Sequence, residues 1–399
     1  MPPRNIAGAP ARGPDFWGRD EDVKALWKLL ERGSVLLTAP RRWGKSSLMF
    51  ALYDDPWPTW SVLQMDVEYV ESPAEFLTEL TAALLQLDPV ARVLRKARKL
   101  PGSLMRWLSG AIDEVGLGEM KLKLRESLNN AQAWPELAEQ LLEQIGNVDG
   151  SLLLIIDEFP MMVANFLERD VQSCVHFLKW FRAQRRVKDG PTLRFLLGGS
   201  INIEPRLELL SQEAVLNDLE RFHLRPMSLE RAVDFVTEVL RGEGARFEQD
   251  VPRQIVHTMG VGVHFFLQVL IAECLAEMRQ QQRSLRGDDI PAIYESRVLG
   301  PLSRARFSHY YSRLKTNYGS LEDAARLVLS RLTHVPECSL EQLQQMLHMD
   351  GQGQAPLDEL VARLESDYYV TRNGSQVRFQ SHFLRDWWLR NAPGPRRKL

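Results

Sequence analysis

The segment from Val35 to Leu52 constrains the fold of this chain more than any other part of the sequence. Val35–Thr38 is a short apolar run typical of a buried strand, and the residues from Ser46 to Leu52 continue with helical character. Between them stands APRRWGKS (Ala39–Ser46), which differs from the phosphate-loop pattern G-x-x-x-x-G-K-[ST] only at its first residue. A strand, this loop and a helix in that order predict an α/β domain that binds phosphate at the helix N-terminus.

The residue types in this loop suit contact with a nucleotide. The Lys45 ammonium is expected to contact the β- and γ-phosphates, and the Ser46 hydroxyl to complete the shell of a bound Mg²⁺ ion. Ala39 can replace the usual glycine only where the backbone avoids positive φ. A positive charge from Arg41 or Arg42 would help to neutralise the triphosphate. The predicted nucleotide-binding residues of the loop are Ala39, Pro40, Arg41, Arg42, Trp43, Gly44, Lys45, Ser46 and Ser47.

A second apolar run ends in two carboxylates. Ser151–Asp157 reads SLLLIID and is followed by Glu158, which is typical of a central parallel strand covered on both faces. The carboxyl ends of such strands are where ligands bind in open α/β sheets. We expect Asp157 to hold Mg²⁺ through water and Glu158 to polarise the water that attacks the γ-phosphate. The alternative is an ordinary Asp-Glu helix start after a buried strand.

Length and composition bound the remaining possibilities. A chain of 399 residues predicts two or three domains. Its 50 basic and 52 acidic residues give a formal charge of −2, so any nucleic-acid binding must come from a local patch. The chain has neither an apolar stretch long enough to span a membrane nor a signal-peptide core at its start. We therefore expect a cytoplasmic protein without a membrane partner.

The first half of the chain alternates strands with helices. Further strands are predicted at Ser61–Met65 and Leu193–Ser200, so residues 16–226 should form a mostly parallel sheet with right-handed crossovers. Residues 90–132 interrupt this pattern and are interpreted as an insertion. Its basic run, Arg92–Lys99, is either a solvated helix face or a contact for a partner or nucleic acid. Met120–Leu124 alternates in the manner of an exposed strand or hairpin arm.

The second half is mostly helical. Residues 227–318 predict helices only, whereas residues 319–392 predict three short helices followed by strands at Tyr368–Thr371 and Val377–Gln380. The Asn-Gly pair between those strands is a hairpin signal. This order is that of a winged-helix domain. Residues 1–15 are rich in Gly, Pro and Ala and are expected to be a flexible tail, and residues 393–399 form a basic tail.

With these pieces in order, the chain resembles the prokaryotic AAA-type P-loop ATPases of the "archaeal ATPase" group, which are relatives of the STAND signalling ATPases and the origin-recognition initiator ATPases. The resemblance runs from about Phe16 to Asn391. It is carried by FWGRDEDVKAL, LLTAPRRWGKSSL, LLLIIDEFP, LLGGSINIEP, LNDLERFHLRPMS and FQSHFLRDWWLRN. It implies an α/β AAA-type parallel-sheet core over residues 16–226, a helical lid with connecting helices over 227–318, a C-terminal winged helix, and ATP with Mg²⁺ as cofactors.

The resemblance also implies roles for single residues. Phe16 and Arg19 would lie near the adenine, and Ser200 would sense the γ-phosphate from the strand beside Asp157. His264 stands in a lid segment where the family usually has proline, so it would either contact phosphate or pack inside the lid. The candidates for an arginine finger are Arg206, Arg221 and Arg225. Each of these arginines has an ordinary ion pair as its alternative.

The predicted winged helix is a poor reader of DNA. Its helix at residues 339–348 carries no lysine or arginine, and the helix at 356–366 has three acidic residues and one arginine. A major-groove helix should present basic and amide side chains to the bases and phosphates. The wing offers Arg372 and Arg378. These features favour a domain for protein interaction or packing over one that reads DNA.

The resulting hypothesis is an ATP-hydrolysing molecular switch. Its nucleotide state, ATP or ADP, would set the positions of the lid and the winged helix, and a partner protein or a second copy of the chain would respond. The alternative is a nucleotide-gated DNA-binding protein that uses the winged helix and the basic clusters. A third interpretation is a scaffold that binds ATP without turnover, which the intact Asp157 and Glu158 disfavour.

Overall fold

The computed structural model describes residues 2–96, 101–111, 114, 116–128, 133–146, 148–185, 193–199, 203–204, 207, 210–300 and 304–392. The chain divides into two compact units. The core unit comprises residues 19–39 and 45–224. The C-terminal unit comprises residues 225–399 together with two earlier segments, 1–18 and 40–44. Among the described residues, no helix is both long and apolar enough to cross a membrane.

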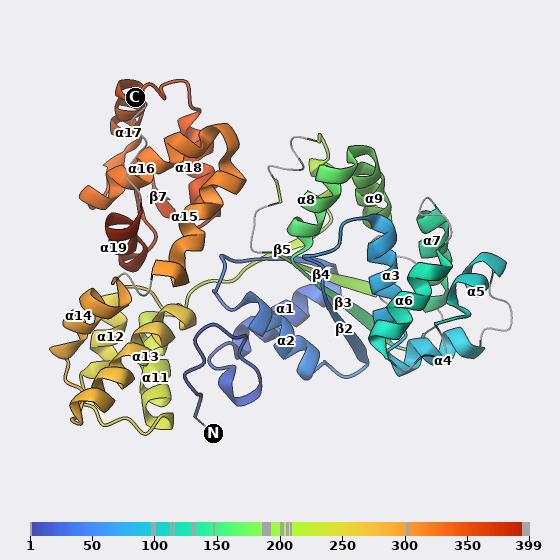
Figure 1. Cartoon of the computed structure of the whole chain (residues 1–399), viewed down its shortest axis with the longest axis horizontal. Helices are drawn as coiled ribbons and strands as arrows, with labels where there is room; N and C mark the ends of the chain where they lie inside the picture. The colour runs from blue at the N-terminus through green and yellow to red at the C-terminus, as the bar shows by residue number, and fades with distance from the viewer. Residues whose placement is uncertain are drawn as a thin grey trace. The chain divides into compact units, whose positions relative to one another are not determined.

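The core unit is built on a parallel sheet of five strands in the order β2-β3-β4-β1-β5 (Figure 1). The strands are β1 (Val35–Thr38), β2 (Trp60–Asp66), β3 (Ser151–Asp157), β4 (Leu193–Gly199) and β5 (Glu220–His223). Four of them match predicted strands, and the predicted α/β parallel-sheet fold is confirmed. Because β4 lies between β1 and β3, the strand that leads into the phosphate loop and the acidic strand flank one common neighbour.

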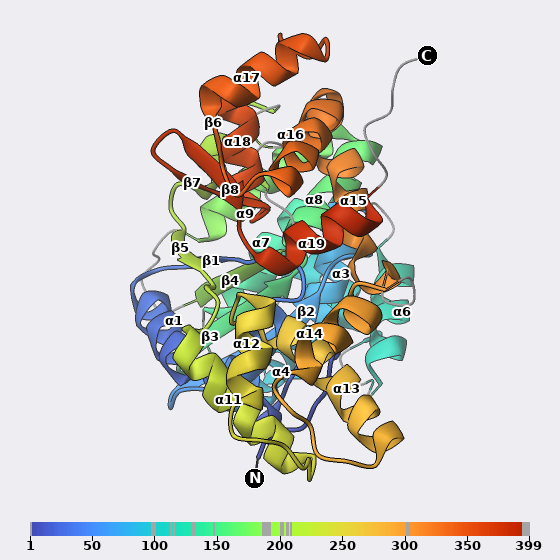
Figure 2. The same cartoon turned by 90° about the vertical axis from the view of Figure 1, so that its left-hand side faces the viewer.

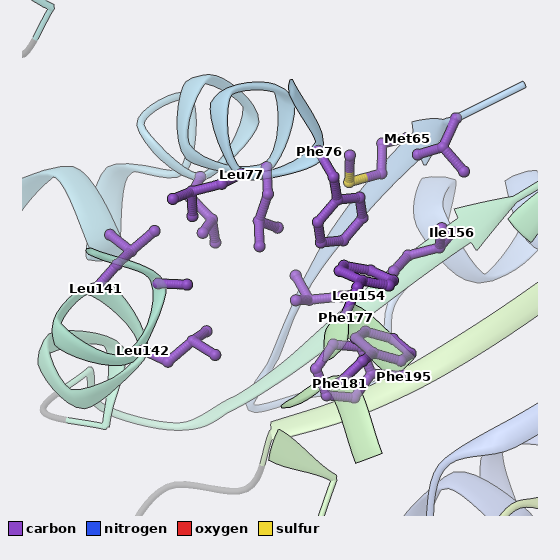
Figure 3. Close-up of a cluster of buried hydrophobic side chains, with 14 of the residues drawn as sticks. Met65, Phe76, Leu77, Leu141, Leu142, Leu154, Ile156, Phe177, Phe181 and Phe195 are labelled. Atoms are coloured by element: carbon purple, nitrogen blue, oxygen red, sulfur yellow. The ribbon is translucent and has the colours of Figure 1, made fainter. Parts of the chain in front are cut away.

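The helices of the core unit are α1 (Asp20–Arg32), α2 (Lys45–Asp54), α3 (Pro73–Leu84), α7 (Trp134–Ile145), α8 (Phe159–Arg169) and α9 (Val171–Gln184), with a 3₁₀ turn at Glu213–Leu216. An aromatic cluster packs α3 and α9 on each other and α9 on the sheet. Phe76 of α3 meets Phe177 of α9 edge to face, with ring centroids 5.1 Å apart (Figure 3). Phe181 of α9 likewise packs on Phe195 of β4 at 5.0 Å. Such pairs stabilise a core beyond the apolar area they bury.

The regular structure in the described part of the insertion is helical. It contains α4 (Asp88–Lys96), α5 (Gly102–Leu108) and α6 (Leu117–Ser127). The prediction of an exposed strand or hairpin arm at Met120–Leu124 is therefore wrong. Met120 and Leu124 are four residues apart, so in a helix both face the same side, and both are buried there. Of the predicted basic run, Arg92 lies in α4, and residues 97–100 lie outside the described residues.

The C-terminal unit begins with the predicted lid. Its helices are α11 (Leu229–Gly242), α12 (Val251–Met259), α13 (His264–Gln281) and α14 (Asp289–Ile293), which continues as a π-helical turn at Tyr294–Val298. Helix α15 (Arg304–Tyr318) and a 3₁₀ turn at Gly319–Leu321 lead to the last domain. The lid helices pack on one another, since α11 contacts both α12 and α13.

The last domain has the predicted winged-helix order (Figure 2). Its elements are α16 (Glu322–His334), β6 (Cys338–Ser339), α17 (Leu340–Met349), α18 (Leu357–Ser366), β7 (Val370–Asn373), β8 (Gln376–Phe379) and α19 (His382–Asn391). The strands form an antiparallel sheet in the order β6-β8-β7. Gly374, in the predicted hairpin turn, has a φ of +61°, a conformation that glycine adopts without steric cost. Trp387 and Trp388 of α19 are buried, as expected of packing residues.

The N-terminal segment, predicted as a flexible tail, makes defined contacts with the lid. Arg4 forms an ion pair with Asp15 of a 3₁₀ turn at Gly13–Asp15, with Nη2 and Oδ2 2.6 Å apart. The Asn5 N–H donates to Glu243 Oε1, just after α11, at 2.9 Å. These are isolated polar contacts without a periodic pattern, so the sequence did not reveal them. The predicted basic tail, residues 393–399, lies outside the described residues.

Candidate nucleotide-binding site

Four predicted site residues meet at the carboxyl end of the sheet. Lys45, the first residue of α2, forms a buried ion pair with Asp157 at the end of β3, and its Nζ lies 3.4 Å from Glu158 Oε1. The Ser46 hydroxyl donates to Asp157 Oδ2 at 2.7 Å. Opposite charges attract more strongly in the protein interior than in water, and hydrogen bonds to the carboxylate add to that attraction. The side chains predicted to bind phosphate and Mg²⁺ are therefore adjacent.

Two glycines of β4 make this close approach sterically feasible. A Cβ on Gly198 would lie 2.0 Å from Met49 Cε of α2 and 3.2 Å from Asp157 Oδ1. A Cβ on Gly199 would lie 2.3 Å from Cδ of Pro160, in the first turn of α8. Without side chains at these positions, α2 and α8 can approach the end of β4 closely. No role was predicted for this glycine pair from the sequence.

Glu158 adopts an unusual backbone conformation. It has φ +57° and ψ +30°, in the left-handed region, and it immediately precedes α8. Its N–H donates to Asp157 Oδ1 at 2.9 Å. A non-glycine residue in this region costs about 1 kcal/mol or more and persists only where its surroundings fix it. The same turn holds the backbone of the predicted catalytic carboxylate and one oxygen of Asp157.

A third carboxylate lies at the same edge of the sheet. Asp66 ends β2 and pairs in register with Asp157 of β3. Its pKa is raised, first because neighbouring protein partly shields the carboxyl from water and further because Asp157 and Glu158 carry like charges, while the Glu68 N–H opposes the shift. No role was predicted for Asp66 from the sequence. Its position, an acidic residue at the end of a predicted strand, is the signal that could have placed it at this edge of the sheet.

The backbone of the phosphate loop combines left-handed positions with ordinary ones. Ala39 does not adopt a positive φ, so the condition for alanine at this place is met. Arg42 and Gly44 have φ of +69° and +95°. The Trp43 N–H donates to the Pro40 carbonyl at 3.3 Å, which closes a turn. Changes between right- and left-handed backbone turn successive N–H groups to one side, as an anion-binding loop requires.

Aromatic residues of the C-terminal unit surround the loop side chains. The guanidinium of Arg42 lies over the Phe265 ring, with Cζ 4.5 Å from the ring centroid. Trp43 packs against Tyr368 with centroids 4.9 Å apart, and the Tyr310 hydroxyl donates to the Arg41 carbonyl at 3.4 Å. The pKa of Arg42 is lowered, first by burial and then by the neighbouring charge of Arg41.

The other residues predicted near the nucleotide make local contacts. Arg19 is buried and pairs with Asp22, with Nη1 and Oδ2 2.9 Å apart. Phe16 lies in the N-terminal segment just before Trp17. The Trp17 carbonyl lies 2.9 Å from His264 Nε2, and the His264 ring packs edge to face on Phe235 of α11 at 4.7 Å. His264 therefore has the contacts of a packed lid residue.

Of the residues predicted as sensor or arginine finger, Arg221 and Arg225 lie within the described part of the chain. Arg221 of β5 forms an ion pair with Glu204, which matches the ordinary alternative for this residue. The positive charge of Arg225 acts to lower the pKa of Tyr368, which burial raises. Ser200 and Arg206 lie outside the described residues.

The wing arginine Arg372 is tied to acidic residues of its own domain. Its Nη1 lies 3.1 Å from Asp358 Oδ1, and its backbone N–H donates to Glu365 Oε1 at 3.0 Å. Both partners belong to α18, the helix that would follow a DNA groove in a nucleic-acid-binding winged helix. The charge on this side of the domain is therefore mixed, which suits protein contacts better than contacts with phosphates.

The donor set at the sheet edge fits Mg²⁺. This ion prefers oxygen ligands and is bound in proteins by one or two carboxylates together with substrate phosphates. The Ser46 hydroxyl and the Asp157 carboxylate supply such oxygens and already lie within hydrogen-bonding distance of each other.

Comparisons with known proteins found matches by structure and none by sequence. No protein-family model matches the sequence, and no curated protein matches it. The solved structure of the Walker-type ATPase PABY2304 of Pyrococcus abyssi is similar over 96% of this chain and 97% of its own, with a TM-score of 0.61 and 16% identity. The Aeropyrum pernix ORC2 protein, in ADPNP–ADP complexes, is similar over 93% of this chain and 91% of its own, with a TM-score of 0.52 and 14% identity.

This chain has the fold of an AAA-type P-loop ATPase. At identities of 16% and 14%, the two similarities establish the fold and leave the chemistry to be argued from the residues. The similar region includes the lid and the winged helix as well as the sheet, because each alignment covers more than nine-tenths of both chains.

Proposed function

We propose that this protein binds MgATP and hydrolyses it slowly as a molecular switch. One observation carries the proposal: Lys45 and Ser46, at the start of the helix that follows the phosphate loop, meet Asp157 and Glu158 at the end of the acidic strand. A buried cation, a hydroxyl and two carboxylates at a helix N-terminus suit phosphate and Mg²⁺ better than they suit any purely structural purpose.

In this proposal each group has a distinct role in binding. The loop N–H groups and the Lys45 ammonium contact phosphate oxygens, because both are donors and carry positive charge. When ATP enters, Lys45 exchanges part of its contact with Asp157 for the phosphates. Ser46 and Asp157 would hold Mg²⁺, and the bound ion would supply positive charge that offsets the negative charge of the phosphates. Phe16 and Arg19 contribute near the adenine.

Hydrolysis requires a base beside the γ-phosphate, and we assign that role to Glu158. Its carboxylate accepts a proton from water while the water oxygen forms a bond to the γ-phosphorus. The bond from that phosphorus to the β–γ bridging oxygen breaks, and ADP leaves with the electron pair. Ser200 is proposed to report the presence of the γ-phosphate.

The output of the switch is proposed to be a change in the lid and the winged helix that a cytoplasmic partner protein, or a second copy of this chain, detects. The ion pair of Arg372 with Asp358 supports a protein contact, because it engages a cation that DNA phosphates would need. Weak binding of duplex DNA that falls steeply with salt remains compatible with this proposal, whereas tight binding with low salt sensitivity would favour the DNA-binding alternative.

Steady-state ATP turnover by the purified full chain tests the proposal, with Lys45→Ala and Glu158→Gln as the two controls. We expect turnover in the wild type and its loss in both variants, with ATP binding lost only in Lys45→Ala. A rate per protein that rises with protein concentration would show that a second copy completes the site. Turnover that survives both substitutions would overturn the proposal, because the activity would then belong to another site or to a contaminant.

A further inference from the structure

The phosphate-loop segment at residues 40–44 belongs to the C-terminal unit, and three elements of that unit contact it. Phe265 comes from the lid helix α13, Tyr310 from the connecting helix α15, and Tyr368 from the turn before β7. Phe265 lies against Arg42, the Tyr310 hydroxyl is hydrogen-bonded to the Arg41 carbonyl and to the Trp43 side chain, and the Tyr368 ring packs on Trp43. The loop is therefore fixed by side chains from the lid, the connecting helix and the winged helix.

Trp43 and Tyr310 are buried at the centre of these contacts. Trp43 has 4% of its surface exposed, although it lies in a loop that is expected to meet a charged ligand. Burial raises the pKa of Tyr310 to about 12, so its hydroxyl remains a proton donor to the Arg41 carbonyl at all ordinary pH values. The Tyr369 hydroxyl donates in turn to the Tyr310 carbonyl at 2.6 Å. Tyr368 thus contacts the loop, and the adjacent Tyr369 contacts helix α15, which itself contacts the loop.

Backbone strain lies on both sides of the contact. Arg42 has φ +69° and Tyr368 has φ +60°, and neither is glycine. Such residues stay in the left-handed region only where the surroundings hold them there, and they concentrate at ligand clamps and switches. Arg42 is next to Trp43 in sequence, so the aromatic contact of Trp43 with Tyr368 bears directly on the backbone that presents N–H groups to phosphate.

We propose that Tyr368 and Tyr310 are positioning residues for the phosphate loop, through which nucleotide binding is coupled to the packing of the winged helix. The inference rests on the proposed function of this loop as a nucleotide site. Tyr368 supplies a ring against Trp43, and Tyr310 supplies a hydrogen bond to the loop backbone. Neither residue touches the phosphates.

The coupling is reciprocal. If contact with Tyr368 favours the loop conformation that binds phosphate, then bound nucleotide favours that contact by the same factor. A partner that draws the winged helix away from the loop would therefore weaken ATP binding, and ATP would oppose that partner. This links the occupancy of the site to the one domain for which no nucleotide contact was predicted.

Equilibrium binding of a fluorescent ATP analogue with Mg²⁺ to the full chain tests the inference. Tyr368→Ala is expected to weaken binding roughly three- to tenfold, the size of effect that a lost aromatic pair produces. Tyr368→Phe should restore wild-type affinity, because the ring alone packs on Trp43. Tyr310→Phe, which keeps the buried ring and removes the donor to Arg41, should weaken binding about two- to fivefold.

Tyr311→Ala is the matched control. It removes an aromatic ring from the same helix α15, but the described contacts of Tyr311 are with Trp388 and the Arg326 guanidinium. Its affinity should equal that of the wild type. A second readout is hydrogen exchange of residues 365–372, which MgATP should slow in the wild type and in Tyr311→Ala but not in Tyr368→Ala.

The outcomes separate the inference from the proposed function. A wild type that binds no nucleotide contradicts the proposed function itself. Binding that depends on Lys45 but is equal in the wild type and Tyr368→Ala overturns the inference and leaves the function standing. Equal weakening by Tyr311→Ala and Tyr368→Ala also overturns it, because the effect would then reflect general loosening of the domain.

Discussion

The helix end and the middle of the phosphate loop are held by different kinds of interaction. At the helix end, Lys45 and Ser46 are fixed by charge and hydrogen bonds to Asp157 within the core unit. In the middle of the loop, Arg42 and Trp43 are fixed by aromatic rings within the C-terminal unit. The first set consists of the groups that the proposed chemistry itself uses, whereas the aromatic rings that hold Arg42 and Trp43 take no part in that chemistry and only shape the loop.

This difference predicts two classes of variant. Buried charges depend strongly on their partners, since removing one leaves the other uncompensated in a poorly polarisable interior. Aromatic contacts each contribute about 1 kcal/mol, so removing one weakens binding without abolishing it. Changes at the helix end should therefore eliminate function, and changes in the middle of the loop should adjust it.

The largest effect is expected for Lys45→Met. It leaves Asp157 buried without its cation, which should lower the free energy of unfolding by about 3 kcal/mol or more, with loss of MgATP binding. Chemical denaturation followed by circular dichroism measures the stability. In the double variant with Asp157→Asn the cost should be clearly smaller than the sum of the single costs, because the two side chains form one ion pair. Additive costs would mean that the pair does not stabilise the core unit.

Gly199→Ala should give the next largest effect, because the new methyl group meets the Pro160 ring, which cannot rotate away. We expect a loss of about 1–3 kcal/mol in the free energy of unfolding. Gly198→Ala should cost less, since the nearest atom is the flexible end of Met49. Gly118→Ala, in the exposed first turn of α6 with no atom within 4 Å of the new Cβ, is the control and should be neutral or slightly stabilising. Equal effects at all three glycines would contradict the steric argument.

The parts of the fold that sequence predicted are those with strong local patterns. Continuous apolar runs located β1 and β3, and the polar residues after those strands located Lys45, Asp157 and Glu158. Strand β5 was missed because it is a short edge strand whose sequence, ERFH, lacks an apolar run. Alternation at Met120–Leu124 was misinterpreted because the spacing of four residues between Met120 and Leu124 also suits a helix.

The aromatic contacts of the loop were beyond reach for a different reason. Trp43 and Tyr368 are more than three hundred residues apart in sequence, and neither belongs to a motif that names the other. The positive φ at Arg42, Glu158 and Tyr368 likewise leaves no trace in the residue type, because none of them is glycine. Such features follow from tertiary packing and become visible only when the whole chain is folded.

Arg42→Lys should give a smaller effect that tests the nature of the contact. Lysine keeps the positive charge but loses the flat guanidinium that stacks on Phe265, so MgATP binding should weaken about two- to fivefold. Titration of the same fluorescent nucleotide measures it. Arg41→Lys is the control, because the described contact of Arg41 with Tyr310 uses the backbone carbonyl. If both variants bind as tightly as the wild type, charge alone explains the two arginines.

Asp66→Asn should give the smallest effect and one that depends on pH. The Asp66 pKa is raised in the folded protein, chiefly by partial burial, with contributions from the charges of Asp157 and Glu158. A raised pKa means that the folded state binds the proton more tightly than the unfolded chain, so this carboxylate lowers stability as pH rises through the interval between the two pKa values. Asparagine removes that penalty. At neutral pH the variant should therefore be more stable, by a few tenths of a kcal/mol because the side chain is still exposed.

The pH profile distinguishes this cause from others. Below the ordinary pKa of aspartate both states of the wild type are protonated, so the advantage of Asp66→Asn should vanish there; it should grow through the titration interval and stay constant above it. Denaturation midpoints measured from acid to neutral pH give the profile. Asp149→Asn, at an exposed position just before β3, removes one charge far from the acidic edge and should not reproduce it. A constant difference at all pH values would show that amide packing, rather than titration of the Asp66 carboxylate, sets the effect.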